Sequence, residues 1–380
     1  MDDAEFDDVL DDWFMESLKT YKDLHVYQLE HPTQVIEWTS GKTVCVAGYS
    51  SSKNEILELH LPPRLFVEEN KGLCAERDFR VVHGGFTDSP IRCLRHIPGT
   101  RWAVTNDGLS SDLQLWDLGG DDSDVIRSTG SIGGSTTVPG SCSRVAVPRS
   151  SQPHVLHGAR SDGVRLSELP SGQTLYESGG VFADPLSSLH FVTDSVFLAA
   201  CSNGNICVVD TRTPAAPRPS PPPECPGDAA FWWADASSGP HPSSCRIIRL
   251  SSSGLALLSD LRNLTAAVGQ AQLDVQTQQH SPDSVRVSWG PRLQHCIALS
   301  GSSGVVQIYD TAVWTTTLQE APLLFEHRGH MVSSHDDIIT SHAWHPDRPR
   351  TLLSAASDGS IHVWDWVDQP AADAELSGTR

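Results

Sequence analysis

The chain has 380 residues, of which 27 are Lys or Arg and 47 are Asp or Glu, so its formal net charge is −20 at neutral pH. An acidic surface repels phosphates, which disfavours electrostatic binding of nucleic acid, and no apolar run approaches the roughly 18 residues that would cross a membrane. The nine cysteines are scattered singly, which favours a reducing compartment, and we expect a cytoplasmic protein.

Residues 1–24 carry the pattern of an acidic amphipathic helix. Apolar side chains recur at spacings of three and four between Phe6 and Tyr21, and all eight charges in residues 1–16 are negative. The helix either caps the domain or anchors a partner, with its aromatic side chains in a groove and its carboxylates facing basic residues. Both alternatives stay open, and they are compatible. The candidate partner-binding residues are Asp7, Asp8, Asp11, Asp12, Trp13 and Phe14.

Residues 25–370 contain short alternating runs at a regular spacing. The segment HAWHPDRPRTLLSAASDGSIHVWD (342–365) matches VSWGPRLQHCIALSGSSGVVQIYD (287–310) at a tryptophan, a proline, a glycine and a closing aspartate, without a gap. Alternating runs separated by turn residues are typical of short antiparallel strands. Repetition at a period of about 40–45 residues or slightly more predicts an all-β fold, a seven-bladed β-propeller. The seven units close at positions 59, 117, 168, 210, 260, 310 and 365.

The ends of the repeat region and two insertions complete the predicted organisation. Strand alternation begins near His25, and we expect HVYQLE to form the outer edge of the last blade, which would close the ring. Residues 127–142 and the proline-rich residues 211–244 do not fit the spacing and are predicted to be mobile insertions, because proline supplies no backbone donor. We expect FWW (231–233) to pack against the fifth blade, and residues 371–380 to form a flexible tail.

Residues for catalysis or for cofactor binding are not evident in the sequence. It lacks a phosphate-binding G-x-x-x-x-G-K-[ST] loop, a G-x-S-x-G turn and a calcium-binding D-x-D-x-D-G loop. The late histidines have no metalloenzyme spacing, and we expect neither a metal nor a cofactor. Cys201 and Cys207 are expected to be small core residues. We therefore predict that the protein is not an enzyme. The late cluster comprises His327, His330, His335, Asp336, Asp337, His342 and His345.

The pair Gly329-His330 followed by Trp364-Asp365 resembles the GH…WD pattern of WD40-repeat proteins. In that family, a histidine, a hydroxyl residue, an aspartate and a tryptophan form a hydrogen-bonded chain that fixes the strands of one blade. The resemblance gives this structural role to four residues, with Ser357 as an alternative source of the hydroxyl. They are His330, Ser354, Asp358 and Trp364.

The chain is also similar, almost end to end, to one member of this family, through strings such as KNEILELHLP (53–62), ERDFRVVHGGF (76–86) and HVWDWVD (362–368). This resemblance implies a cytoplasmic scaffold that binds and stabilises the paired endonuclease subunits of the Integrator complex, which processes small nuclear RNA. It also implies an association with spindle poles and microtubules, and the alternative function is an adaptor there. Because such nucleases need a basic cleft, we hypothesise that the acidic arm keeps the nuclease inactive until maturation.

Overall fold

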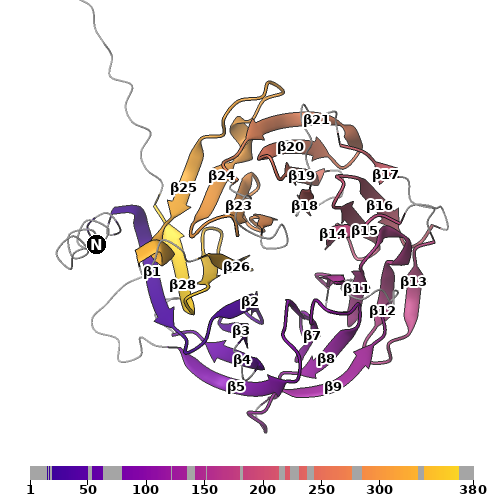
Figure 1. Cartoon of the computed structure of the whole chain (residues 1–380), viewed down its shortest axis with the longest axis vertical. Coiled ribbons are helices and arrows are strands. Elements are labelled where there is room, and N and C mark those ends of the chain that lie inside the picture. Colours follow the sequence, from indigo (N-terminus) through magenta and orange to yellow (C-terminus); the bar gives the residue numbers. More distant parts are fainter. Residues whose placement is uncertain are drawn as a thin grey trace, which may run out of the picture.

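A computed structural model of the chain shows seven four-stranded antiparallel sheets arranged as blades around a ring (Figure 1). This arrangement confirms the predicted seven-bladed β-propeller. Among the described residues, no helix has both the length and the hydrophobicity to cross a membrane. The structure describes residues 15, 17, 19–49, 54–62, 79–120, 122–134, 142–150, 152–179, 183–213, 219–222, 231–237, 244–275, 285–332 and 338–367.

Each blade contributes one strand to the inner side of the ring and one to its outer edge. Blade 1 contains, from inside to outside, β2 (Thr33–Trp38), β3 (Thr43–Tyr49), β4 (Asn54–His60) and β5 (Arg80–Thr87). Blade 2 contains β6 (Cys93–His96), β7 (Trp102–Asn106), β8 (Leu113–Asp117) and β9 (Arg127–Ile132). Blade 3 contains β10 (Arg144–Ala146), β11 (His154–Gly158), β12 (Arg165–Glu168) and β13 (Thr174–Glu177).

The remaining blades follow in chain order. Blade 4 contains β14 (Leu186–Phe191), β15 (Val196–Cys201), β16 (Ile206–Asp210) and β17 (Pro219–Ser220). Blade 5 contains β18 (Trp232–Ala236), β19 (Arg246–Ser251), β20 (Leu255–Asp260) and β21 (Asn263–Gln272). Blade 6 contains β22 (Arg286–Trp289), β23 (Cys296–Ser300), β24 (Val306–Asp310) and β25 (Leu323–His327). Blade 7 contains β26 (Ile339–Trp344), β27 (Leu352–Ala356), β28 (Ser360–Trp366) and β1 (Tyr21–Gln28). Three short 3-10 helices are η2 (Ser161–Gly163), η6 (Thr311–Val313) and η7 (Gly329–Val332).

The recurring aspartate has a local structural cause. Asp117, Asp210, Asp260 and Asp310 end the third strands of their blades, and each carboxylate accepts a hydrogen bond from the backbone N–H two residues later, at 2.8–3.1 Å. A short acidic side chain suits this turn because it mimics a backbone acceptor. These four closing positions therefore mark the point at which the third strand of the blade leaves its sheet.

The recurring glycine is equally local in origin. Gly204, Gly254 and Gly359 each lie six residues before a closing aspartate and have φ values of +87°, +85° and +88°. Only glycine adopts this left-handed conformation without steric cost, so the turn between the second and third strands requires it. Blade 6 differs, because its glycine with positive φ is Gly301 rather than the predicted Gly304.

The two ends of the described chain meet in blade 7, as predicted. Strand β1 pairs with β28 over its length, from Tyr21 opposite Trp366 to Gln28 opposite Ser360 (Figure 1). The strand begins at Tyr21, four residues before the predicted start, and the residues immediately before it are helical. Pairing the ends covers the edge that β28 would otherwise expose.

Both segments that were predicted to be insertions contain strands of the propeller. In the first, Arg127–Ile132 forms β9, an edge strand whose first five residues are exposed, which explains its polar composition. In the second, Pro219–Ser220 forms β17 at the outer edge of blade 4, where proline needs no ladder partner. The segment Trp232–Ala236 forms β18, the inner strand of blade 5, so the prediction that FWW packs against this blade is confirmed.

The hydrophobic core is divided among the interfaces between neighbouring blades. One cluster joins blades 5 and 6 around Trp233, Trp289 and Tyr309, and another joins blades 7 and 1 around Ile36 and Leu353. Because each middle strand is covered on both faces, β27 is buried at all five positions. The blades therefore hold each other in place through packed side chains.

Candidate functional site

A hydrogen-bonded chain of buried side chains crosses blade 7. Trp364 Nε1 donates to Ser354 Oγ at 3.1 Å, and His330 Nε2 lies 2.8 Å from the same oxygen. On its other side, His330 Nδ1 lies 2.6 Å from Ser360 Oγ. The Asp358 carboxylate accepts the Ser360 backbone N–H at 2.7 Å and so holds the second serine in place. Ser360 was missed, although the preceding aspartate and glycine mark a turn that could have indicated it.

Two further histidines extend this chain to β1. Tyr21 Oη lies 2.8 Å from His327 Nδ1, and His327 Nε2 lies 3.0 Å from His362 Nδ1. The His362 ring stacks on His330 with centroids 3.7 Å apart. This cluster therefore connects β1, the end of blade 6 and β28, the third strand of blade 7.

The same three histidines are the one group among the described residues whose nitrogens lie close enough for a metal ion, all within 4.8 Å. Both nitrogens of His327 and of His330 already have hydrogen-bond partners. A metal ion would have to displace these hydrogen bonds. The arrangement therefore fits neutral imidazoles that donate and accept hydrogen bonds better than it fits metal ligands. His335, Asp336 and Asp337 lie outside the described residues.

Replacing Ser354 with alanine should destabilise the propeller by about 2 kcal/mol, because both Trp364 Nε1 and His330 Nε2 lose their shared partner inside the core. Chemical denaturation measures the change. Ser171→Ala, at an exposed turn, is the matched control and should change the stability by less than about 0.5 kcal/mol. Equal effects of the two substitutions would show that the buried hydroxyl does not hold the blade together.

Hydroxyl and imidazole groups also meet in blade 3, where His157 Nε2 lies 3.0 Å from Ser167 Oγ. Both residues are 1% exposed, so a substrate has no access to the pair. Cys201 and Cys207 are likewise buried, and burial raises the pKa of their thiols to about 12 and about 11, which keeps them protonated. These groups are therefore part of the core.

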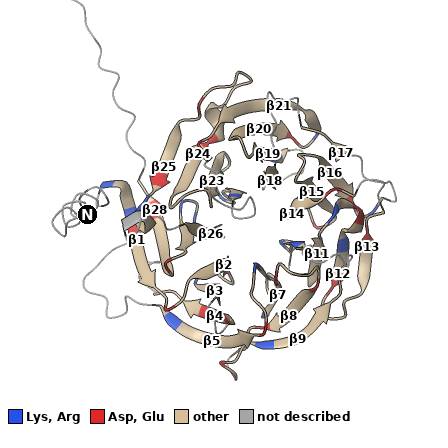
Figure 2. Ribbon diagram, viewed as in Figure 1, with Lys and Arg blue, Asp and Glu red and all other residues tan. Residues whose placement is uncertain are grey.

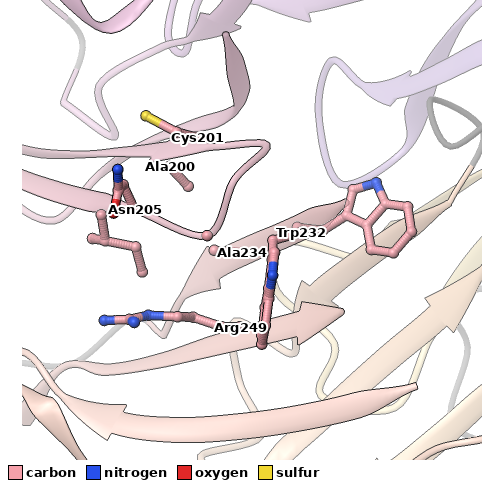
Figure 3. Close-up of a pocket in the computed structure, with 9 residues that line it drawn as sticks. Ala200, Cys201, Asn205, Trp232, Ala234 and Arg249 are labelled. Carbon is pink, nitrogen blue, oxygen red and sulfur yellow. The ribbon is translucent and has the colours of Figure 1, made fainter. Parts of the chain in front are cut away.

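A small cavity lies between blades 4 and 5, where Asn205, Trp232 and Arg249 contribute to its lining (Figure 3). The empty space between these side chains is about 130 Å³, which includes space open to solvent, and none of it is wide enough to hold a water molecule. Arg249 is 1% exposed and donates to the carbonyl oxygens of Pro221 and Leu264, both at 2.9 Å. The guanidinium thus links the outer edges of blades 4 and 5 through hydrogen bonds. Because the cavity has no room even for a water molecule, it is not a ligand site.

Charged groups join other blades near the inner strands. Arg95 of β6 donates to Glu37 of β2 at 2.8 Å, which links blades 2 and 1. Asp235 of β18 lies 2.9 Å from His190 Nδ1 of β14 and accepts the backbone N–H of Trp289 in β22 at 2.7 Å, so it links blades 4, 5 and 6. These contacts fix the blades relative to one another and give the ring rigid faces.

The predicted partner-binding residues, Asp7, Asp8, Asp11, Asp12, Trp13 and Phe14, lie outside the described residues. Of the predicted structural residues, the structure joins His330, Ser354 and Trp364 directly and places Asp358 behind Ser360. Acidic and basic segments are distributed over all the blades (Figure 2). The described part of the ring therefore carries charges of both signs on every side.

Seven four-stranded blades with a histidine–serine–tryptophan chain define a WD40-repeat propeller, a class of protein-binding scaffold, and the family model for the WD domain, G-beta repeat matches residues 324–365. The chain is 46% identical to the Integrator complex assembly factor WDR73 of Danio rerio over 95% of this chain and 98% of that protein. It is 42% identical to the Homo sapiens protein of that name, over 94% and 98% of the two chains. The chain belongs to this family of Integrator complex assembly factors.

Proposed function

We propose that this chain is a non-enzymatic scaffold that binds and stabilises the paired endonuclease subunits of the Integrator complex in the cytoplasm. Similarity along nearly the whole length to proteins named as Integrator complex assembly factors is the observation that carries the proposal. The rigid ring supports it, because preformed faces bind a partner without the entropic cost of ordering them. Buried hydroxyl–imidazole pairs, inaccessible to substrate, are consistent with a role in binding.

Co-expression of the full chain with the two endonuclease subunits tests this function. We expect a complex that survives size-exclusion chromatography and a larger soluble yield of the subunits than without the chain. Cross-link mapping on the complex would identify the propeller face or rim that makes the contact. Recovery of separate components at micromolar concentration would contradict the proposal.

The acidic arm supplies the finer part of the proposal. We expect Asp7→Asn, Asp8→Asn, Asp11→Asn and Asp12→Asn together to weaken the complex roughly tenfold at low salt, because four charges facing a basic cleft each contribute a few tenths of a kcal/mol. The effect should shrink as salt screens it. The measurement is the dissociation constant across a salt series, with nuclease activity of the complex recorded in parallel.

A matched variant carries the same change in charge elsewhere on the surface. The four exposed acids Asp88, Asp122, Asp124 and Glu320 are replaced with their amides. This variant should bind as tightly as the unmodified chain and leave the nuclease equally inactive. Unchanged affinity of the arm variant at every ionic strength would reject a role for the arm, whereas the scaffold function would remain.

The alternative of a microtubule or spindle-pole adaptor remains a prediction. Microtubule surfaces are acidic, so a direct contact needs a basic face on a chain of net charge −20. Co-sedimentation of the purified chain with microtubules tests this function independently of the endonuclease.

A further inference from the structure

Three inner strands bring arginines from different blades to the centre of the ring. Arg95 lies in β6, and Arg144 and Arg286 are the first residues of β10 and β22. All three are partly exposed. Basic segments border the ring centre beside β7, β11 and β23 (Figure 2). A chain with an excess of twenty negative charges thus gathers positive charge at its axis.

The three guanidinium groups differ in what they contact. Arg95 donates to the Glu37 carboxylate at 2.8 Å, whereas Arg144 Nε donates to the neutral carbonyl oxygen of Leu186 at 3.1 Å. Arg286 Nε is buried and finds no hydrogen-bond acceptor among the residues that the structure describes. Asp235, a buried acid on the neighbouring inner strand, is occupied by His190 and the Trp289 N–H. Arg286 is therefore a cation with a buried N–H donor. The described part of the fold provides no acceptor for this donor.

The electrostatic surroundings of Arg286 indicate what would satisfy it. Burial lowers the pKa of its guanidinium, and the positive charges of Arg95 and Arg144 lower it further, whereas Cys93 and Glu37 act in the opposite direction. A buried donor without an acceptor costs free energy, and a cation beside other cations costs more. An anion at this point removes both costs, since it accepts the hydrogen bonds and offsets the charges.

We propose that the centre of the ring binds an oxyanion, a carboxylate or a phosphate group, held by Arg286 together with Arg144. A guanidinium presents two parallel N–H donors that match either group. Arg95 and Glu37 lie beside this site as an ion pair, so the charge of each is largely offset by the other. The inference goes beyond the assembly role and does not depend on it, because the anion is bound by this chain alone.

Thermal unfolding of the full chain tests the site with two probes at constant ionic strength. Inorganic phosphate represents a free anion, and a tetraglutamate peptide, compared with tetraglutamine, represents the side chains of an acidic polypeptide. We expect at least one probe to raise the melting temperature, and its dissociation constant to increase by about tenfold or more in Arg286→Met. Arg262→Met is the matched control, because Arg262 is exposed and pairs with Asp260, a neighbour in its own turn.

The outcomes separate the sources of the anion. Stabilisation by phosphate alone identifies a free anion, and stabilisation by tetraglutamate alone identifies a polypeptide carboxylate. Phosphate also stabilises proteins generally, so only the difference between the unmodified chain and Arg286→Met counts. If Arg286→Met fails to fold, Arg144→Met replaces it in the same comparison. Equal shifts in the variant and the unmodified chain, or no shift with either probe, would overturn the proposal.

Discussion

Acidification from pH 7 to pH 4 should lower the free energy of unfolding steeply, because five buried histidines stay neutral in the folded chain. Burial lowers the pKa of His157 and His362 to about 4 and that of His342 to about 3, and it places those of His327 and His330 well below the ordinary value of 6.5. Above pH 6.5 both states are neutral and stability is complete. Below it, only the unfolded chain takes up these protons, and each histidine costs about 1.4 kcal/mol per pH unit until its folded pKa is reached.

Urea denaturation at a series of pH values measures this slope. His362→Gln should reduce it by about 1.4 kcal/mol per pH unit between pH 6 and pH 4, whatever the substitution does to stability at neutral pH. His60→Gln, at the exposed end of β4, is the control and should leave the slope unchanged. Protonation also relieves the repulsion of a chain with net charge −20, which acts in the opposite direction but equally in both variants. Parallel slopes for His362→Gln and the unmodified chain would exclude His362 as a source of the acid sensitivity.

The repeat could be predicted from the sequence because the residues that recur in it, an aspartate and a glycine, are required by the local geometry of turns. An aspartate such as Asp260 accepts an N–H two residues later, and a glycine such as Gly254 supplies a positive φ that no other residue adopts cheaply. Each requirement is met within one unit, so it recurs wherever the unit recurs. Ring closure could be predicted for a related reason, since a propeller with an unpaired last strand would expose an edge.

The contacts between units could not be predicted in the same way. Tyr21 and His327 are 306 residues apart in the sequence, and neither residue type indicates the other. Edge strands were missed because little of them is buried: β9 and the two-residue β17 have the composition of loops and need few apolar side chains. The surroundings of Arg286 could not be predicted either, because residues of three other blades, Arg95, Arg144 and Glu37, provide them.

Replacing Glu58 with alanine should cost about 3 kcal/mol or more, because this carboxylate is 1% exposed and joins blade 1 to blade 2. Its two oxygens accept from Arg101 at 2.9 and 2.6 Å, and Thr39 Oγ1 and His83 Nδ1 lie 2.8 and 2.7 Å away. Burial alone would raise the pKa of Glu58, but the hydrogen bonds from Arg101 and its neighbours lower it overall. The contribution is therefore present above pH 4.5 and decreases as the pH falls below it.

A double-mutant cycle with Arg101→Met separates the pair from the rest of the interface. Removing either partner alone leaves the other without its main contact, so the double variant should be less destabilised than the sum of the single changes by about 1–3 kcal/mol. Glu55→Ala, three residues earlier on β4 and partly exposed, should cost less than about 0.5 kcal/mol. Strict additivity would show that blades 1 and 2 are held by packing alone. Coupling would instead show that an ion pair 43 residues apart in sequence sets the position of one blade against the next, and with it the shape of the face that a partner meets.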